Sequence, residues 1–296
     1  MKTGIAFLVA ALSFVCLSAE QHASERGLAK YEGKDLQTSD DTALAAFAKS
    51  YKVTTGEEIG TNWSAPKPWL VNRFSGGNAS WIVLLVYPGY EIPDVSFVEA
   101  HLFDKDWNRL AKEEFPTGYR MFIKEAKVVR ELALSCDTLV IKTVSAGPFM
   151  VTQSGRKPAF EQGAFQLQHY AALGTNLHLV RISDDNGRLV RNSYRSRSPF
   201  KGPSVPARTA VEWGQSLSST NAVEVLASLV YLTGGHLLGS EQRSPNVNQE
   251  SVEDAKLFEE VLGAGTTKQT LKTLVASPIP WIAEYAKLAA RLQQGD

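Results

Sequence analysis

The chain has few cysteines and only one long apolar run. Its 296 residues include two cysteines, Cys16 and Cys136, and Cys16 lies inside the apolar run near the N-terminus. If that run is removed, one thiol remains, so no disulfide can form within the mature chain. A chain of roughly 275 residues buries enough surface to fold without disulfides. Because no later run approaches the ~20 apolar residues of a membrane-spanning helix, we expect no transmembrane segment in the mature chain.

The chain also has no excess charge and none of the common catalytic motifs. Its 31 basic residues balance 31 acidic ones, so the overall charge favours neither nucleic acid nor a membrane surface as a partner. The sequence contains no His-Glu-x-x-His, no pair of closely spaced cysteines and no Gly-x-Ser-x-Gly. We therefore assign no metal, no cofactor and no catalytic residue from motifs.

Residues 1–19 are typical of a secretory signal peptide. Lys2 precedes an apolar run over 4–17 that is too short to span a bilayer. Cleavage is expected after Ser18 or Ala19, which predicts a secreted or periplasmic protein. A lipoprotein anchored at Cys16 is the less favoured alternative, because the three residues before this cysteine are unlike the small residues that precede a lipidated one.

Residues 20–79 are expected to form a polar N-terminal segment with one short helix. Asp40 and Asp41 can cap a helix over 42–51, in which apolar residues recur at helical spacing. Several glycines and prolines between residues 53 and 77 predict an irregular connection.

Residues 80–195 have the pattern of an antiparallel β-rich domain, either a sandwich or a meander. The run 81–87 is apolar on both faces, as expected of a central strand. Around Asn186 and Gly187 we expect a type I′ turn that joins strands 176–183 and 188–194. Strands are further predicted over 97–103, 119–129, 138–144 and 165–168, with a turn over 104–108.

A linker over 196–208, rich in serine, proline and glycine, precedes a helical region over 209–296. Together with the strands this predicts an α+β protein. Starts of three helices are expected at the capping patterns Thr209 with Glu212, Ser251 with Asp254 and Thr266 with Gln269, and a fourth at Ser277 with Pro278. The helices are predicted over 209–217, 221–233, 250–262, 266–275 and 279–293.

The C-terminal third, about 209–293, resembles HEAT-type helical repeats. Two stretches, 209–232 and 267–292, each combine a short helix, a tight turn and a longer amphipathic helix. The resemblance implies a surface for binding other molecules. The region has two helix pairs with one helix between them, fewer than the three repeats that usually form a stable solenoid. At a constant offset of 59 residues, Val223, Leu226, Ala227 and Val230 correspond to Ile282, Tyr285, Ala286 and Ala289.

Several residues could carry chemistry, although an ordinary structural role is favoured for each. His101 and Asp104 could act as metal ligands or as an acid/base pair. Cys136 could act as a nucleophile with His169 or His178 as its base. Two pairs of adjacent acids, Glu57 with Glu58 and Glu113 with Glu114, could serve glycoside hydrolysis. A glycine-containing loop over 263–268 precedes a helix and could attract an anion.

A local excess of basic residues between 181 and 208 is the most uneven feature of the chain. Guanidinium groups can hold an acidic polymer or an acidic partner by paired hydrogen bonds. A solvated hairpin edge, on which charge prevents aggregation, is the favoured alternative. The candidate binding residues for an anionic partner are Arg188, Arg191, Arg195, Arg197 and Lys201.

The sequence thus predicts an exported, non-catalytic protein that binds or scaffolds through its helical module. Its expected partner is another envelope protein or an acidic polymer. The alternative is an extracytoplasmic hydrolase with a site at the rim of the sheet, which convergent groups with perturbed pKa values would favour.

Overall fold

A computed structural model describes most of the chain after residue 26. The described ranges are 27–59, 66–87, 97–116, 121–145, 165–189, 210–235 and 260–293. The predicted signal peptide over 1–19, the lipidation alternative at Cys16 and the linker over 196–208 lie outside them.

Eight strands form two antiparallel sheets of four, each in the order in which its strands follow along the chain. This confirms the prediction of an antiparallel β-rich domain, and β2 is a central strand as expected. Sheet A contains β1 (Lys67–Gly76), β2 (Ala79–Tyr87), β3 (Phe97–Phe103) and β4 (Arg109–Pro116). Sheet B contains β5 (Met121–Glu131), β6 (Cys136–Ser145), β7 (Phe165–Leu173) and β8 (Asn176–Ser183), with the short helix η2 (Leu132–Leu134) between β5 and β6.

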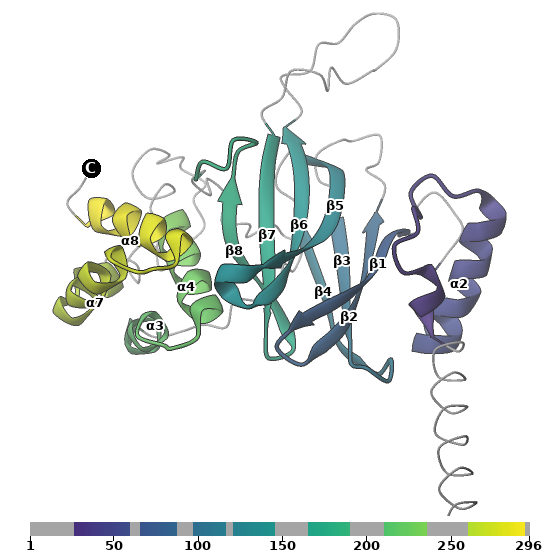
Figure 1. The fold of residues 1–296 in the computed structure, drawn as a ribbon, viewed down its shortest axis with the longest axis horizontal. Helices are drawn as coiled ribbons and strands as arrows, with labels where there is room; N and C mark the ends of the chain where they lie inside the picture. Colours follow the sequence, from purple (N-terminus) through teal and green to yellow (C-terminus); the bar gives the residue numbers. More distant parts are fainter. Residues whose placement is uncertain are drawn as a thin grey trace, which may run out of the picture.

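The two sheets enclose a common apolar core (Figure 1). Side chains alternate along a strand, so every second residue points into this core. In β3, Val98, Ala100 and Leu102 point inward, which leaves Glu99 and His101 on the outer face. Core residues from both sheets include Ile82, Leu84, Val98, Leu102, Leu139, Ile141 and Tyr170.

The outer face of sheet A is covered by N-terminal elements, which explains why β2 is apolar on both faces. The helix η1 (Leu28–Tyr31) and the helix α2 (Asp41–Thr55) form a second core with Val83 and Leu85 of β2. As predicted, Asp40 caps α2, and its side chain accepts a hydrogen bond from the backbone N–H of Ala43 at 2.8 Å.

The prediction of an irregular connection over 53–77 was wrong from residue 67 onward, because β1 occupies Lys67–Gly76. Proline is tolerated in β1 because this strand is the edge of sheet A. At the other end of β1, Gly77 forms the tight turn to β2 with φ of +52°. A Cβ atom at Gly77 would lie 2.3 Å from the carbonyl oxygen of Gly174, so only glycine fits here. The glycines that suggested an irregular connection thus form the turn of a β-hairpin.

The hairpin turn after β8 has a different geometry from the one predicted. Gly187 has φ of +74°, but Asn186 has no positive φ, so the turn is not of type I′. The side chain of Asp184 accepts hydrogen bonds from the backbone N–H groups of Asn186 and Arg188. Ser183 and Leu189 form a bridge, and the rest of the predicted strand over 188–194 lies outside the described residues.

Four described helices follow the sheets, close to where the sequence predicts them. They are α3 (Ala210–Leu217), α4 (Ala222–Gly235), α7 (Gly265–Val275) and α8 (Pro280–Leu292). The fifth predicted helix, over 250–262, falls mostly outside the described residues, and the chain is helical over 260–263.

Two predicted helix starts were displaced. Ala264 is the N-cap of α7, with no side-chain cap, so Thr266 lies inside the helix rather than before it. Helix α8 begins at Pro280 rather than at Pro278. The backbone N–H of Ile279 donates to the hydroxyl of Ser277 at 3.2 Å, which supports the turn before the helix.

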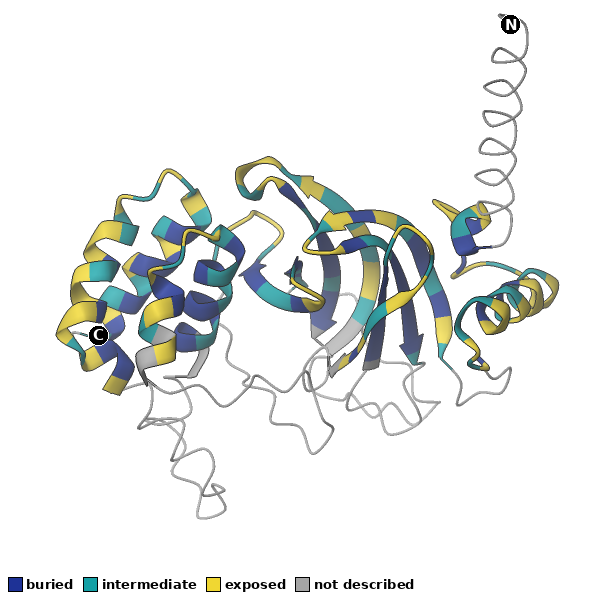
Figure 2. Ribbon diagram, turned by 90° about the horizontal axis from the view of Figure 1, so that it is seen from below, coloured by how far each residue is buried: buried dark blue, intermediate teal, exposed yellow. Residues whose placement is uncertain are grey.

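The helices cover the outer face of sheet B (Figures 1 and 2). Leu226 and Leu229 of α4 pack with Ala171 and Val180 of the sheet, and α4 contacts both β7 and β8. The molecule therefore has four layers, in the order α2, sheet A, sheet B and the helical region. Among the residues that the structure describes, no helix has both the length and the apolar character needed to cross a membrane.

Candidate functional site

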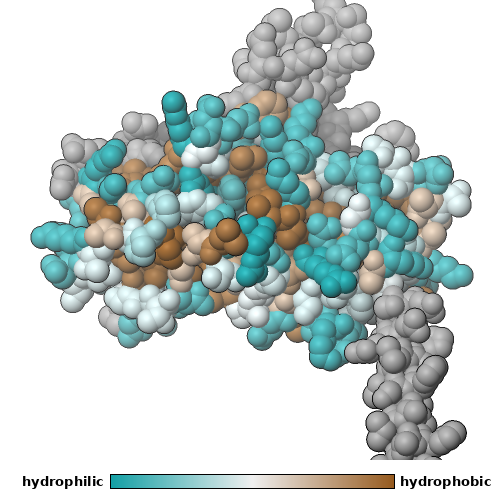
Figure 3. Space-filling view, in the orientation of Figure 1, coloured by the Kyte–Doolittle hydropathy of each residue, from teal (hydrophilic) through white to brown (hydrophobic). Residues whose placement is uncertain are grey.

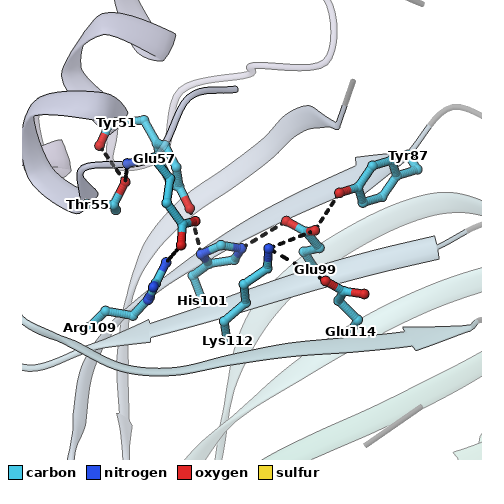
Figure 4. A network of polar contacts seen from close by, with 9 residues as sticks. All are labelled: Tyr51, Thr55, Glu57, Tyr87, Glu99, His101, Arg109, Lys112 and Glu114. Carbon is cyan, nitrogen blue, oxygen red and sulfur yellow. Dashed lines mark hydrogen bonds and ion pairs between the residues drawn. The ribbon is translucent and has the colours of Figure 1, made fainter. Parts of the chain in front are cut away.

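A cluster of hydrogen-bonded and charged side chains lies between α2 and the outer face of sheet A (Figure 4). Strands β3 and β4 supply most of it, because the register places Glu99 opposite Glu114 and His101 opposite Lys112. The cluster comprises Tyr51, Thr55, Glu57, Tyr87, Glu99, His101, Arg109, Lys112 and Glu114.

His101 is the centre of this cluster and has no exposed surface. The hydroxyl oxygen of Tyr51 lies 2.7 Å from its Nδ1 atom, and Oε2 of Glu99 lies 3.1 Å from its Nε2 atom. Glu99 and His101 are two residues apart in β3, so both point toward α2. A continuous chain of hydrogen bonds thus runs from the helix through the imidazole to a carboxylate.

Glu99 is held in its charged form although it is buried. Burial raises the pKa of its carboxyl, but hydrogen bonds from His101 and Tyr87 and the charge of Lys112 outweigh this effect and lower the pKa to about 2. The hydroxyl of Tyr87 donates at 2.5 Å, and Nζ of Lys112 lies 3.2 Å from the carboxylate. Burial is also the main cause of the raised pKa values of Tyr51 and Tyr87.

Ion pairs close the exposed rim of the cluster. Arg109 Nη1 lies 2.7 Å from Oε1 of Glu57, and Lys112 Nζ lies 3.5 Å from Oε1 of Glu114. The guanidinium of Arg109 keeps the pKa of Glu57 below its usual range. The charges at this rim are therefore paired with one another.

The cluster is better suited to fastening α2 to the sheet than to acting on a substrate. The side chains of Tyr51 and His101 are 1% and 0% exposed, so a substrate could not reach the imidazole without displacing the helix. A general base must come within hydrogen-bond reach of the proton that it removes. The partly exposed parts of the cluster are the end formed by Tyr87 and Lys112 and the ion pair of Arg109 with Glu57.

The pair of His101 and Asp104 considered from the sequence is not formed. Asp104 instead organises the turn between β3 and β4, where its side chain accepts from the backbone N–H groups of Asp106 and Asn108. In the same turn Trp107 has φ of +65°, and its ring stacks on Trp81 with centroids 4.7 Å apart. The favoured structural role of Asp104 is thus confirmed.

Cys136 lacks the surroundings of a nucleophile. Its side chain is buried at the start of β6, and burial raises the pKa of its thiol. A reactive cysteine needs the opposite shift, toward the thiolate. His169, one of its two proposed bases, instead packs edge-on against the ring of Trp281, with centroids 5.1 Å apart.

The two pairs of adjacent acids are divided between different partners. Glu57 pairs with Arg109, and Glu58 with Lys52. On β4, Glu114 points outward to Lys112, whereas Glu113 points into the sandwich and accepts from the backbone N–H of Leu177 at 2.5 Å. Neither pair places two carboxyl groups across a common space, as glycoside hydrolysis requires.

The glycine-containing loop over 263–268 is a turn into α7. The backbone N–H of Lys268 donates to the carbonyl of Ala264 at 3.1 Å, within the first turn of the helix. Within the described residues, the structure shows no group of three or more side chains that could hold a metal ion.

Arg188 is the one described member of the predicted binding strip, and it is exposed beside the β8 turn. The other four members, Arg191, Arg195, Arg197 and Lys201, lie outside the described residues, so the strip stays a prediction.

Arg181, which adds to the same basic excess, is buried where β8 meets α8. Its guanidinium carbon lies 4.8 Å from the centre of the Trp281 ring, and its Nη2 atom lies 3.4 Å from Oε2 of Glu284. The same nitrogen donates to the carbonyl of Gly187 at 2.5 Å. Arg181 thus joins the helical region to the sheet and is not part of a free basic surface.

The sequence analysis missed Glu99, Tyr51 and Lys112 as partners of His101. One signal was present, since Glu99 and His101 are polar residues two apart in a strand whose other members are mostly apolar. Such spacing places both on one face. Their partners come from separate elements, so only the packing of α2 on sheet A brings them together.

Comparison with known proteins gives no relative from which a function could be transferred. No protein family, no curated protein and no solved structure matches the chain significantly.

Proposed function

We propose that this chain is an exported, non-catalytic protein that binds a partner through its helical region. The main support is that the polar cluster between α2 and sheet A is closed. Its central groups, His101 and Glu99, are buried and bonded to one another and to Tyr51 and Tyr87, which suits a structural tie. Because α2 covers the outer face of sheet A in this way, the exposed side chains of the helical region are the surface proposed for a partner.

The packing of the helices supports a repeat of HEAT type. Helix α3 packs on α7 and α4 packs on α8, as equivalent helices of successive repeats do. The positions that correspond at an offset of 59 residues are largely buried in both helices, for example Val223 with Ile282 and Leu226 with Tyr285. Stacked pairs of this kind expose the outer helices to a partner.

A photo-crosslinking experiment in the producing cells tests this function. A crosslinking residue would replace exposed Gln269 on α7 or, as a control, exposed Glu125 on β5 of the full-length chain. We expect an adduct at Gln269 and none at Glu125. An adduct that forms only at Glu125, or at neither position, would contradict binding through the helices.

Export rests on the leader over 1–19. A mass spectrum of the purified protein should show a chain that begins near residue 19 or 20. A lipid-modified Cys16 would instead support the lipoprotein alternative, and an intact Met1 in the cytosol would reject export.

The second candidate function is an extracytoplasmic hydrolase that uses the partly exposed end of the polar cluster. This end holds Tyr87 and Lys112 next to the charged carboxylate of Glu99. If this end were catalytic, the wild-type chain would turn over a generic ester, phosphate or glycoside, and the Lys112→Met variant would lose that turnover. Absence of turnover across such a panel would remove this function.

A further inference from the structure

The charged side chains of the hairpin of α7 and α8 are almost all basic. Its 28 residues include four basic side chains and one acidic side chain, Glu284. All four basic side chains are exposed, and each helix contributes two that are four residues apart. We call this set the basic hairpin surface: Lys268 and Lys272 on α7, Lys287 and Arg291 on α8.

The four cations are not paired with acidic side chains of the described residues. Glu284 forms its ion pair with Arg181 of sheet B. Within the described ranges, the side chains of the four cations form no ion pair and no hydrogen bond. On sheet A, by contrast, Arg109 and Lys112 are paired with carboxylates.

This charge belongs to the hairpin and not to the helical region as a whole. Helices α3 and α4 contain the acids Glu212 and Glu224 and no basic residue. The hairpin of α7 and α8 also lies at the opposite end of the molecule from α2 (Figure 1). On the face shown in Figure 3, apolar side chains gather over the helical region and the adjoining sheet, with hydrophilic ones around them. The four exposed cations belong to the end of the molecule that α7 and α8 form.

The composition of this surface distinguishes between kinds of acidic partner. Protein interfaces are enriched in aromatic residues and arginine and depleted in lysine. Here three of the four cations are lysines, and their exposed neighbours on α7 are Thr266, Gln269 and Thr273, which can bond to hydroxyl groups. Two residues four apart on a helix differ by about 6 Å along its axis. Flexible lysines at such intervals suit a chain of repeated anionic groups.

We infer that the basic hairpin surface binds an acidic polysaccharide. This inference deepens the proposed function, on which it rests, by naming the class of partner. The contacts are ionic and exposed, so binding weakens as salt screens them. The anion-binding site is therefore expected on α7 and α8, and not on the basic strip between Arg188 and Lys201.

Affinity for heparin, used as a model acidic polysaccharide, tests the inference on the full mature chain at low salt. In the hairpin variant the four cations become glutamine, which keeps good helix propensity and removes the charge. We expect about tenfold weaker binding, since each exposed ionic contact adds little alone. A matched variant loses four exposed cations of the N-terminal elements and β1, Lys30, Lys34, Lys49 and Lys67, and should bind nearly as the wild type does.

Three outcomes would overturn the inference. They are no binding by the wild-type chain, equal weakening in both variants, or unchanged binding by the hairpin variant. In the last case, loss of binding after Arg191, Arg195 and Arg197 are changed to alanine would assign the site to the strip. Circular dichroism confirms that each variant is folded. A crosslinked adduct at Gln269 with no heparin binding would leave the proposed function standing and reject only the polysaccharide.

Discussion

Two buried glutamates in adjacent strands show how local surroundings decide charge. Glu99 of β3 lies outside the sandwich, where hydrogen-bond donors hold its pKa at about 2 despite burial. Glu113 of β4 points into the sandwich, where burial raises its pKa to about 7 against the effect of its single bond from Leu177. Its second oxygen, Oε2, is buried without a hydrogen-bond partner. Burial raises the pKa of Tyr170, and the charge of Glu113 adds to this effect.

The raised pKa of Glu113 predicts that stability falls as the pH rises. The folded chain holds this proton more tightly than the unfolded chain, whose carboxyl titrates near 4.5. The stabilising effect of the proton is complete below about pH 4.5 and is lost as the pH rises through about 7. The Glu113→Gln variant cannot lose a proton there. Its free energy of unfolding should therefore rise relative to the wild type between pH 5 and 8, by up to about 3 kcal/mol.

Urea denaturation at pH 5, 6.5 and 8 checks this prediction. The matched control is Glu114→Gln, which changes the exposed neighbour on the same strand and should show no such pH dependence. Parallel stability profiles for wild type and Glu113→Gln would show that Glu113 stays charged or neutral throughout.

At the level of single elements, periodicity predicted central strands and helices well, but it missed β1 and β4, the edge strands of sheet A. The strand over 97–103 and the helix starting near Asp40 were evident, because alternation and a cap are local signals. Strand β1 was missed because its flanking glycines and prolines resemble breakers. Strand β4 was missed because its charged residues hide the apolar alternation of a strand. These residues are paired with acids of other elements, such as Glu57 and Glu99, which are distant in the sequence. The same lack of a local signal hid the polar cluster.

The bond between Tyr51 and His101 should make a large contribution to the docking of α2. The Tyr51→Phe variant leaves Nδ1 of His101 buried without a partner, which costs about 1–3 kcal/mol. Chemical denaturation measures the loss. Tyr31→Phe is the matched control, because Tyr31 makes a longer, 3.3 Å contact with the half-buried Ser50 and its loss should cost less. Equal effects would mean that the cluster does not hold the helix.

At the scale of the whole molecule, the free edge of sheet B is closed by its neighbours on both sides. Strand β8 is an edge strand, and unpaired edges promote association. Glu113 of sheet A accepts from the N–H of Leu177, and the hydroxyl of Tyr285 in α8 accepts from the N–H of Ile182 at 3.0 Å. Strand β8 thus links sheet A, sheet B and the helical region. These contacts join residues far apart in the sequence, so no local sequence pattern predicts them.

Loss of the Tyr285 hydroxyl should loosen this edge locally. In the Tyr285→Phe variant the N–H of Ile182 loses its acceptor, so stability should fall by about 1–3 kcal/mol. Amide hydrogen exchange should become faster at Ile182 than at Leu177, which keeps its bond to Glu113. If both amides kept their wild-type protection, the contact with α8 would not be what protects the strand.

Lysine footprinting tests binding at the end of the helical region most directly. The full mature chain would be treated with an amine-acylating reagent, with and without an acidic polysaccharide, and the modified lysines would be quantified by mass spectrometry. Lys268, Lys272 and Lys287 should become protected, whereas exposed Lys49 on α2 should react as before. Protection of Lys49 alone, or unchanged modification of all four lysines, would contradict a binding surface on α7 and α8.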